Sequence, residues 1–379
     1  MSLVKPEKVF GLLPDQDFSA LAAAQAQQPL RLSSPNPRVG CVLTTADGQL
    51  IGQGHTQAAG GPHAEVMALA DAAAKGNSVV GCTVYVTLEP CSHHGRTGPC
   101  CDALIVAGIK KVVAAIADPN PLVSGRGFER LRAAGIEVVV GPGAAESREL
   151  NIGFFSRMIR KTPWVRMKIA ASLDGKTALL NGQSQWITSS AARADGHAWR
   201  ARACAVLTGI GTVLKDQPRL DVRLVATPRQ PHLVIVDSQL ETPPDAPLFI
   251  AGRAVFIYAA LPNVLKQQAL EARGATVVYL PGANGKVDLN AMLLDLARRE
   301  INELHVEAGH KLNGSLVRAS LVDEFVVYLA PKLLGQGSGM ADFGPLNALS
   351  DAVELAFVSA ESLGPDLRIV ARVKGRDSF

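Results

Sequence analysis

Short apolar runs rich in branched residues alternate with helix-like segments along the chain. In the first half, strand-like runs occur at 39–44, 83–88, 112–117 and 136–140, and helix-like segments occur at 64–75, 101–111 and 127–135. The runs are short enough for buried strands, and each helix-like segment ends in glycine or in a basic last turn. This order predicts an α/β fold with helices layered on a sheet.

A segment that begins with glycines and a proline interrupts the alternation between residues 141 and 163. Strand-like runs then resume at 164–171, 232–237, 254–259, 275–280, 303–308, 324–330, 353–359 and 367–373. The length of 379 residues also exceeds the usual size of one domain, roughly 100–200 residues. We therefore predict two domains, residues 1–161 and residues 162–379.

The composition excludes several classes of protein. Apolar residues make up 47% of the chain, which is enough for substantial cores. The net charge is only +4, without a long lysine or arginine run, which argues against a general polyanion-coating role. No apolar run approaches the roughly 18 residues of a membrane span, and the first residues lack the apolar core of a signal peptide. We expect a cytoplasmic protein that binds neither membranes nor nucleic acid.

Cysteine and histidine gather in one short segment. The six cysteines lack the spacing of a disulfide framework, yet three of them lie with two histidines in LEPCSHHGRTGPCC, residues 88–101. Upstream, GGPHAEVMAL places His63 and Glu65 at the start of a helix. Catalytic Zn²⁺ commonly takes three protein ligands and leaves one position for water, whose pKa falls towards neutrality. His63, Cys91 and Cys100 would suffice as ligands, and Glu65 could move the proton as a carboxylate that is not a ligand.

This pattern matches the signature of zinc nucleobase deaminases in part. The signature is His-x-Glu followed by Pro-Cys-x-x-Cys. The chain has His63, Glu65 and the Pro90-Cys91 pair, but eight residues separate Cys91 from Cys100. Spacing alone does not decide whether Cys100 or its neighbour Cys101 binds the metal.

Other interpretations of the cluster remain open at this point. Taken singly, His63 is typical of a satisfied histidine at a helix start, and Cys100 of a small buried residue. Taken together, the residues favour a catalytic metal site over a purely structural role. A structural zinc site would need a fourth ligand, which His93, His94 or Cys101 could supply.

Seven segments carry a resemblance to a known family. They are NPRVGCV, GQGHTQAAGGPHAEVMAL, YVTLEPCSHHGRTGPCCDALI, DPNPLVSGRG, KIAASLDGKTA, SQWITS and VEAGHKLNGS. Over nearly its whole length the chain resembles the bifunctional riboflavin-biosynthesis enzymes, in which a pyrimidine deaminase is fused to a 5-amino-6-(5-phosphoribosylamino)uracil reductase. The resemblance implies a cytidine-deaminase-like α/β/α layered domain followed by a dihydrofolate-reductase-like α/β domain.

The resemblance also implies roles for individual residues of the first domain. The metal ligands of the family fall on His63, Cys91 and Cys100, and its proton shuttle falls on Glu65. Positions that line the pyrimidine and ribose-phosphate pocket match Asn36, His55, His93, Arg96, Asp118 and Asn120. Arg96 suits a phosphate because its planar guanidinium pairs with oxygens, although an exposed loop arginine has the same appearance in a sequence. The family usually has two prolines before the second metal cysteine, and Gly98 replaces the first of them here.

The second half carries no further metal cluster, and its local motifs are weak. GIGTVL at 209–214 lacks the third glycine of a dinucleotide fingerprint, while VEAG at 306–309 ends a strand before a helix whose backbone amides could meet phosphate. Here the resemblance implies an NADPH-dependent reductase that converts the ribosyl group to ribityl phosphate. Its cofactor positions match Ala170, Trp186, Thr212, Asp216, Ser238, Gly309, His310, Lys311, Leu312, Asn313, Gly314 and Ser315. Its substrate positions match Ser184, Arg200, Leu220, Arg223 and Glu307.

Two charged residues of the second half are candidates for catalysis. Lys168 lies in an apolar strand, where a charged side chain should be paired or functional, and it matches a polar family residue near the reacting sugar, as does Asp216. A lysine–carboxylate pair could protonate the ring-opened imine. Arg200 and Arg223 are candidates for holding the 5′-phosphate of the substrate.

The resulting hypothesis is a bifunctional enzyme with one Zn²⁺ per chain and NADPH as cofactors. It would deaminate 2,5-diamino-6-(5-phosphoribosylamino)pyrimidin-4-one and then reduce the ribosyl group, acting as a homo-oligomer, either a dimer or a tetramer. An RNA-editing deaminase is the main rival, but the chain lacks the basic groove and interleaved aromatics typical of strand binders. A zinc-stabilised scaffold without catalysis is a further alternative.

Overall fold

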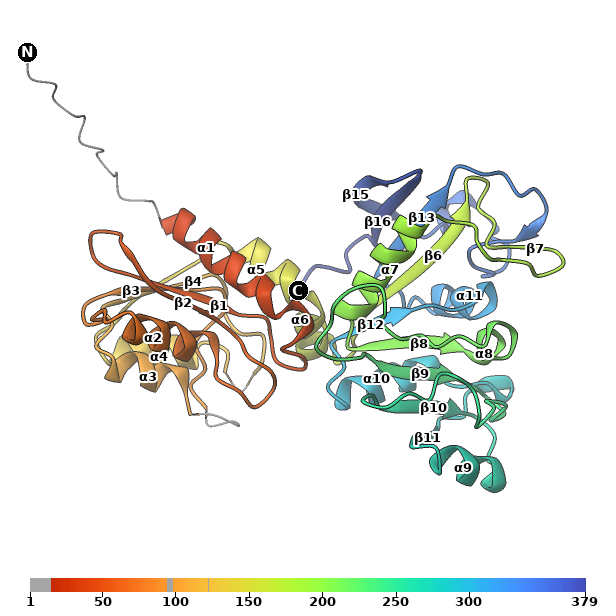
Figure 1. Cartoon of the computed structure of the whole chain (residues 1–379), viewed down its shortest axis with the longest axis horizontal. Helices are drawn as coiled ribbons and strands as arrows, with labels where there is room; N and C mark the ends of the chain where they lie inside the picture. Colours follow the sequence, from red (N-terminus) through yellow and green to blue (C-terminus); the bar gives the residue numbers. More distant parts are fainter. Residues whose placement is uncertain (1–14, 94–97, 122) are drawn as a thin grey trace, which may run out of the picture. The chain divides into compact units, whose positions relative to one another are not determined.

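The chain folds into two compact units, each with its own sheet. The computed structural model describes residues 15–93, 98–121 and 123–379 (Figure 1). Unit 1 ends at Asn151, and unit 2 runs Ile152–Phe379. Helix α6 (Ile152–Arg160) thus belongs to unit 2, ten residues before the boundary expected from the sequence. Arg157 of α6 donates from Nε to Asn302 Oδ1 at 2.5 Å, which ties the helix to the second sheet.

Unit 1 is built on a five-stranded sheet with the order β2-β1-β3-β4-β5. Its strands are β1 (Gly40–Thr44), β2 (Leu50–His55), β3 (Thr83–Val86), β4 (Lys111–Ala114) and β5 (Glu137–Val140). Strand β1 runs antiparallel to β2 and β3, whereas β3, β4 and β5 are parallel. Apart from β2, these strands coincide with the runs that the sequence predicts, although β4 begins one residue before its run.

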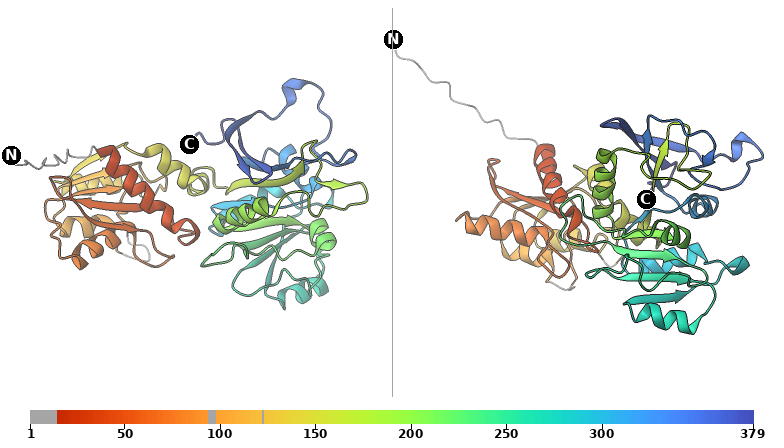
Figure 2. Two further views of the ribbon diagram at one scale, coloured as in Figure 1. Left: turned by 45° about the horizontal axis from the view of Figure 1, so that its top comes forward. Right: turned by 45° about the vertical axis from the view of Figure 1, so that its right-hand side comes forward.

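Helices cover both faces of the first sheet. They are α1 (Asp15–Gln27), α2 (Ala64–Ala74), α3 (Cys100–Val106), α4 (Arg126–Ala133) and α5 (Ala144–Leu150). The views in Figures 1 and 2 show α2, α3 and α4 on one face and α1 with α5 on the other. Phe18 of α1 packs on Val42, Tyr85 and Val113 of the central strands. The layered α/β/α arrangement is the one expected from the sequence.

Sequence reasoning missed strand β2 because glycine is a weak strand former. Gly54 of β2 is needed for the packing of α2 on the strand. A Cβ atom at Gly54 would lie 2.5 Å from the backbone nitrogen of Ala68, so only glycine lets α2 approach the strand so closely. That close contact sets the position of α2 against the sheet.

The loops of unit 1 that matter for function leave from a single edge of the sheet. Gly40 at the start of β1 pairs with His55 at the end of β2, and the Thr87 N–H, just after β3, donates to the Gly40 oxygen at 3.1 Å. Because β4 is parallel to β3, its end also lies at this edge. We call it the loop edge of unit 1, made of the start of β1 and the ends of β2, β3 and β4.

Unit 2 is built on a nine-stranded sheet with the order β11-β10-β9-β8-β12-β6-β13-β16-β15. The strands from β11 to β13 in this order are parallel, and β16 and β15 add an antiparallel hairpin at one edge. Their bounds are β6 (Trp164–Ser172), β8 (Ala205–Gly209), β9 (His232–Val236), β10 (Val255–Ala259), β11 (Ala275–Tyr279), β12 (Glu303–Val306), β13 (Glu324–Ala330), β15 (Leu355–Leu363) and β16 (Asp366–Val373).

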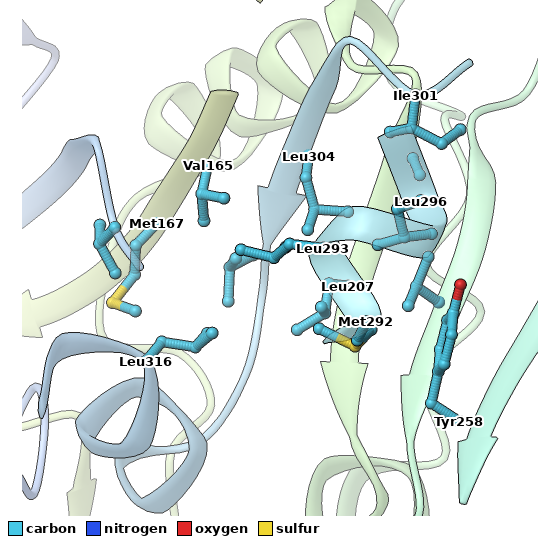
Figure 3. Close-up of a cluster of buried hydrophobic side chains, with 14 of the residues drawn as sticks. Val165, Met167, Leu207, Tyr258, Met292, Leu293, Leu296, Ile301, Leu304 and Leu316 are labelled. Carbon is cyan, nitrogen blue, oxygen red and sulfur yellow. The ribbon is translucent and has the colours of Figure 1, made fainter. Parts of the chain in front are cut away.

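Helices also pack on both faces of the second sheet. They are α7 (Ser190–Arg202), α8 (Ile210–Asp216), α9 (Val264–Glu271), α10 (Leu289–Arg298) and α11 (His310–Arg318). Figure 3 shows Met292, Leu293 and Leu296 of α10 and Leu316 of α11 beside buried side chains of the sheet. On the opposite face, Trp199 of α7 packs on Val326 and Tyr328, and Leu270 of α9 packs on the strands further along.

A short two-stranded ribbon lies near the carboxyl ends of the parallel strands of unit 2. It consists of β7 (Ala178–Leu179) and β14 (Gly337–Ser338), which pair antiparallel. The carboxylate of Asp174 fastens the two loops, since it accepts the N–H groups of Leu334 and Gly335 at 3.0 and 2.8 Å. None of the helices in the described ranges has the length and apolar character needed to cross a membrane.

Candidate active sites

Three potential metal ligands converge at the loop edge of unit 1. The His63 Nδ1 atom lies 3.5 Å from the Cys91 Sγ and 3.3 Å from the Cys100 Sγ, and the three donor atoms lie within 4.8 Å of one another. His63 caps the start of α2, Cys91 follows β3, and Cys100 is the first residue of α3. Two helix starts and one strand end therefore bring together residues separated by up to 37 positions.

The spacing of these atoms fits a tetrahedral zinc ion. Bonds of about 2.0 Å to nitrogen and about 2.3 Å to sulfur at the tetrahedral angle give a nitrogen–sulfur separation of about 3.5 Å. The observed separations of 3.5 and 3.3 Å are close to this value. Among the described residues, no fourth histidine, cysteine or carboxylate joins the group. One imidazole and two thiols are the donor set of a catalytic zinc site with an open position.

Electrostatics around the group favour an anionic sulfur on Cys91, whereas the hydrogen bond with Cys91 and burial raise the pKa of Cys100. Hydrogen bonding with Cys100 and His63 lowers the pKa of the Cys91 thiol, against the effect of burial. The Cys100 backbone N–H, at the start of α3, also donates to the Cys91 Sγ at 3.3 Å. The hydrogen bond with Cys91 raises the pKa of the His63 imidazole.

Glu65 lies beside the three ligands in the first turn of α2. Its side chain is buried, with 4% of its surface exposed, and it interacts electrostatically with Cys91, His63 and Cys100. Burial and the negative charge of Cys91 raise the pKa of Glu65 to about 7. A carboxyl group with such a pKa exchanges a proton readily near neutral pH, which suits an acid–base role.

The structure shows which of the adjacent residues Cys100 and Cys101 belongs to the ligand group, a question that spacing alone did not decide. Cys100 points into the group of three, whereas the Cys101 thiol donates to the Pro90 oxygen at 3.2 Å and approaches the Gly127 oxygen at 3.6 Å. Burial raises the pKa of Cys101 to about 12, so its thiol stays protonated. Cys101 is a buried hydrogen-bond donor, and the fourth-ligand alternative does not hold for it.

Sequence reasoning missed Glu89, which organises the loops around the site. Its buried carboxylate accepts four backbone N–H groups, from Asp118 at 3.1 Å, Gly125 at 2.9 Å, Gly127 at 2.8 Å and Phe128 at 3.4 Å. This carboxylate fixes the chain between β4 and α4 against the segment that carries Cys91. The signal was present in the Glu-Pro-Cys sequence, where only the cysteine was given a role.

Most of the predicted substrate residues of unit 1 lie at the loop edge. Asn36 precedes β1, His55 ends β2, His93 follows Cys91, and Asp118 and Asn120 follow β4. Asp118 is buried, and its Oδ1 atom accepts the Asn120 N–H at 2.7 Å. Burial and the negative charges of Glu89 and Cys91 together raise the pKa of Asp118 to about 7, against the effect of the hydrogen bond from the Asn120 N–H. Arg96 and His94 lie outside the described residues.

Unit 2 contains a cavity of about 1130 Å³ at the carboxyl ends of its parallel strands. Ligands of open α/β sheets bind in this position. The cavity is lined by seventeen of the eighteen residues predicted for this unit: Lys168, Ala170, Ser184, Trp186, Arg200, Thr212, Asp216, Leu220, Arg223, Ser238, Glu307, Gly309, His310, Lys311, Leu312, Asn313 and Ser315. Gly314 is the exception, because it faces the backbone of Asp342, where a Cβ atom would lie 1.8 Å from the oxygen.

Backbone groups at two strand-to-helix turns also line this cavity. Strand β8 leads directly into α8, and Gly209, Ile210 and Gly211 of that turn lie on the wall. Strand β12 leads through Gly309 into α11. Backbone N–H groups at the start of a helix attract phosphate groups. The glycine motif at 209–214 and the VEAG turn are both suitably positioned to bind a phosphate group of a ligand in the cavity.

Three charged side chains form the polar centre of the cavity. The Arg200 Nε atom donates to Glu307 Oε1 at 2.7 Å, and Nη2 donates to Oε2 at 3.0 Å. Lys168 lines the same cavity, and its electrostatic partner is Glu307. Burial lowers the pKa of Lys168, while the charge of Glu307 partly restores it. Among the described residues no ion pair joins Lys168 to Asp216, and the carboxylate whose charge acts on Lys168 is that of Glu307.

Arg166 lies two residues before Lys168 on the same face of β6, but it has a structural environment. It is fully buried, forms an ion pair with Glu324, and donates to Glu303 at 2.8 Å. Its guanidinium also lies 4.6 Å from the ring centre of Trp199. Arg166 therefore lies in a buried ion-pair network, whereas Lys168, two residues later on the same face of β6, lies on the cavity wall.

Several cavity residues received no role from the sequence. They include Arg193, Lys215, Arg219, Glu241 and Lys286. Arg193 stacks its guanidinium 4.4 Å from the ring centre of Trp186, whose side chain is 62% exposed. A cation–π contact of this kind holds an exposed indole in a defined orientation.

Family models match both units of the chain. The model described as the RibD C-terminal domain matches residues 163–369, and the cytidine and deoxycytidylate deaminase zinc-binding region matches residues 14–116. Riboflavin biosynthesis protein RibD of Escherichia coli (strain K12) is 42% identical over 368 residues, which cover 94% of this chain and 98% of the relative. RibD of Aquifex aeolicus (strain VF5) is 42% identical over 355 residues, which cover 94% of this chain and 97% of the relative.

Solved structures agree with the family models. Acinetobacter baumannii RibD matches with a TM-score of 0.85 and 38% identity, covering 94% of this chain and 98% of that one. A Thermotoga maritima protein described as a diaminohydroxyphosphoribosylaminopyrimidine deaminase/5-amino-6-(5-phosphoribosylamino)uracil reductase matches with a TM-score of 0.84 and 32% identity, covering 95% and 98%. With a zinc-type donor set in unit 1 and a ligand cavity in unit 2, the chain belongs to the RibD family of bifunctional riboflavin-biosynthesis enzymes, which join a zinc-dependent deaminase to an NADPH-dependent reductase.

Proposed function

We propose that unit 1 deaminates 2,5-diamino-6-(5-phosphoribosylamino)pyrimidin-4-one by hydrolysis and that unit 2 reduces the ribosyl group of the product to ribityl phosphate. The observation that carries the first step is the convergence of His63, Cys91 and Cys100 beside a buried Glu65 that is not a ligand. The second step is supported by a cavity large enough for a dinucleotide and a nucleotide-like substrate, lined by Lys168, Arg200 and Glu307.

In unit 1, His63, Cys91 and Cys100 would hold the metal ion. A zinc ion held by these residues would lower the pKa of a bound water molecule towards neutrality. The Glu65 carboxylate takes a proton from the water and returns it to the departing amine. Glu65 is free for this task because it interacts with the ligands without joining them.

The pyrimidine and its ribose phosphate would be held at the loop edge of unit 1. We assign substrate contacts to Asn36, His55, His93, Arg96, Asp118 and Asn120. The described members of this set precede β1 or follow β2, β3 and β4, so all of them lie on the edge that bears the ligands. Glu89 is a positioning residue, since its hydrogen bonds hold the loop that contains Asp118.

In unit 2, we assign the cofactor contacts to Ala170, Trp186, Thr212, Asp216, Ser238 and the segment 309–315. NADPH supplies the reducing equivalent when bound. We assign to Lys168 the donation of a proton to the ring-opened sugar, which is supported by its position on the cavity wall and by the charge of Glu307 that acts on its amine. Ser184, Leu220, Arg223 and Glu307 contact the substrate, and Arg200 orients Glu307 through two hydrogen bonds.

We further propose that the protein is a homo-oligomer, a dimer or a tetramer, which works in the cytoplasm on small phosphorylated molecules and binds neither nucleic acid nor membranes. Strand β15 supports the oligomer, because it is an edge strand with almost every residue exposed, including Phe357 at 79%. Exposed apolar edge strands are commonly covered by a partner. Light scattering at several concentrations tests this, and a monomer at all of them would refute it.

The central experiment follows the mass of the products. The purified protein is incubated with the diaminopyrimidine ribosylamino phosphate, first without and then with NADPH. Deamination replaces an NH group by oxygen, so the mass rises by about one unit without the cofactor. Reduction adds two hydrogens, a further rise of about two units once NADPH is present. An unchanged mass under both conditions would refute the proposal.

A further inference from the structure

Two exposed guanidinium groups on the cavity wall share one buried carboxylate. The Asp221 Oδ2 atom accepts from the Arg219 Nε at 3.0 Å and lies 2.9 Å from Nη2, and Oδ1 accepts from the Arg223 Nη1 at 2.7 Å. The Asp221 side chain is 5% exposed, whereas those of Arg219 and Arg223 are 58% and 52% exposed. Most N–H groups of both arginines therefore remain available to a ligand in the cavity.

The backbone of this segment is held from behind by two further arginines. Arg253 donates to the oxygens of Leu220 and Arg219, each at 2.7 Å, and Arg200 donates to the Asp221 oxygen. Loops usually carry side chains with variable positions, but this one is anchored at three consecutive carbonyl groups. Fixed guanidinium groups lose less side-chain entropy when they bind a ligand.

The local charge matches a doubly charged anion. Around this segment three guanidinium groups, those of Arg219, Arg223 and Arg253, face the single carboxylate of Asp221, while Arg200 is paired with Glu307. Two positive charges remain uncompensated. A phosphate monoester carries up to two negative charges near neutral pH, and guanidinium groups bind its oxygens in pairs.

We infer that Arg219 joins Arg223 to hold the phosphate group of the substrate, and that Asp221 positions both guanidinium groups. Three of the five N–H groups of Arg200 are already engaged, since Nε and Nη2 bond to Glu307 and Nη1 to the Asp221 oxygen, so Arg219 and Arg223 offer more free donors. The inference rests on the proposed reductase function and adds a residue to its substrate site. The same chemistry could serve a phosphate of the cofactor, so the experiment separates the two ligands.

Binding to the full-length protein is measured by calorimetry with ribose 5-phosphate and, separately, with adenosine 2′,5′-bisphosphate. Arg219→Ala should weaken binding of ribose 5-phosphate by about tenfold or more, the loss typical of a hydrogen bond to a charged group, and leave the bisphosphate unchanged. Arg298→Ala is the control, since Arg298 is exposed on α10 and does not line the cavity. Unchanged ribose 5-phosphate binding would overturn the inference, and loss of the bisphosphate alone would move the site to the cofactor.

Kinetics provide the second readout. Arg219→Ala should raise the KM of the phosphorylated substrate by about tenfold and change kcat by less than about twofold, because the phosphate lies away from the reacting carbon. The dephosphorylated substrate should react equally with both proteins. An inactive wild-type enzyme would count against the proposed reductase itself, whereas an active one with an unaltered variant would count against Arg219 alone.

Asp221→Asn tests the positioning role by the sign of its effect. The amide keeps the shape of the side chain but adds one net positive charge to the segment. If Asp221 orients the guanidinium groups, ribose 5-phosphate binds more weakly to the variant. If it only lowers the local charge, ribose 5-phosphate binds more tightly, and the positioning role is refuted.

Discussion

Arg200 holds Glu307 in a two-pronged ion pair, with Nε 2.7 Å from Oε1 and Nη2 3.0 Å from Oε2. Burial alone would raise the pKa of Glu307, but the charges of Arg200 and Lys168 keep it below its ordinary value. Glu307 is therefore ionised at neutral pH. Its carboxylate holds the Arg200 guanidinium in place, and its negative charge also acts on Lys168.

Replacing Glu307 by glutamine should impair the reductase and spare the deaminase. The amide presents an NH₂ group to Arg200 and removes the negative charge beside Lys168, a loss of about 1–3 kcal/mol for a hydrogen bond to a charged group. NADPH oxidation should fall at least about tenfold. Ammonia release in the absence of NADPH serves as the internal control, and a variant with normal reductase activity would contradict the role of the pair.

Glu65→Gln should abolish ammonia release without loss of the metal. The side chain keeps its size, but the amide cannot take up and return a proton, which typically costs about 10²–10⁴-fold in rate. Zinc content by elemental analysis should stay at one ion per chain, because Glu65 is not part of the ligand group. A variant that still releases ammonia would show that another group moves the proton.

Cys100→Ser and Cys101→Ser should differ sharply in zinc content. The Cys100 sulfur lies 3.3 Å from His63 Nδ1, whereas the Cys101 thiol donates to the Pro90 oxygen. The first substitution removes a ligand and should leave far less than one zinc per chain after dialysis. The second should retain zinc and cost about 1 kcal/mol of stability or less, because the hydroxyl can still donate. Equal zinc loss in both variants would contradict the assignment.

Glu89→Gln tests whether one carboxylate positions the substrate loop. Its two oxygens accept four backbone N–H groups, and an amide would turn its own N–H donors towards at least one of them. We expect a higher KM for deamination with zinc retained, because Asp118 is displaced while the ligands are not. The reductase rate should stay unchanged. A lower kcat with an unaltered KM would place the effect on the chemical step instead.

His305 should make the stability of unit 2 depend on pH. Burial and the charges of Arg166, Arg200 and Lys168 together lower its pKa from 6.5 to about 3, against the opposing charge of Glu307. On unfolding below pH 6.5 the imidazole takes up a proton, so stability falls as the pH drops from 6.5 towards 3, by up to about 1.4 kcal/mol per unit. The loss is complete once the pH passes below the folded pKa.

Urea unfolding followed by tryptophan fluorescence checks this, because Trp164, Trp186 and Trp199 are the only tryptophans of the chain and all lie in unit 2. His305→Leu should show a flatter dependence between pH 7 and pH 5. Both ring nitrogens of His305 lack a hydrogen-bond partner, so the apolar replacement should cost little stability at pH 7. An unaltered slope would contradict the assignment.

The sequence by itself determined the fold class and the chemistry of the metal site. The spacing of apolar runs predicted both sheets, because burial of branched residues sets strand length locally. Two domains of these classes, with zinc and NADPH as cofactors, agree with the family to which the chain belongs. His63, Cys91 and Cys100 were recognisable because metal ligation needs rare donor types, which composition makes conspicuous.

Only the tertiary structure decided the directions in which side chains point and which residues, far apart in the sequence, interact. Adjacent cysteines are equivalent in a sequence, but the start of α3 turns Cys100 inwards and Cys101 towards Pro90. The carboxylate whose charge acts on Lys168 is that of Glu307, 139 residues away, which directly follows β12, the parallel neighbour of β6. Such partnerships follow from strand order, which no local pattern encodes.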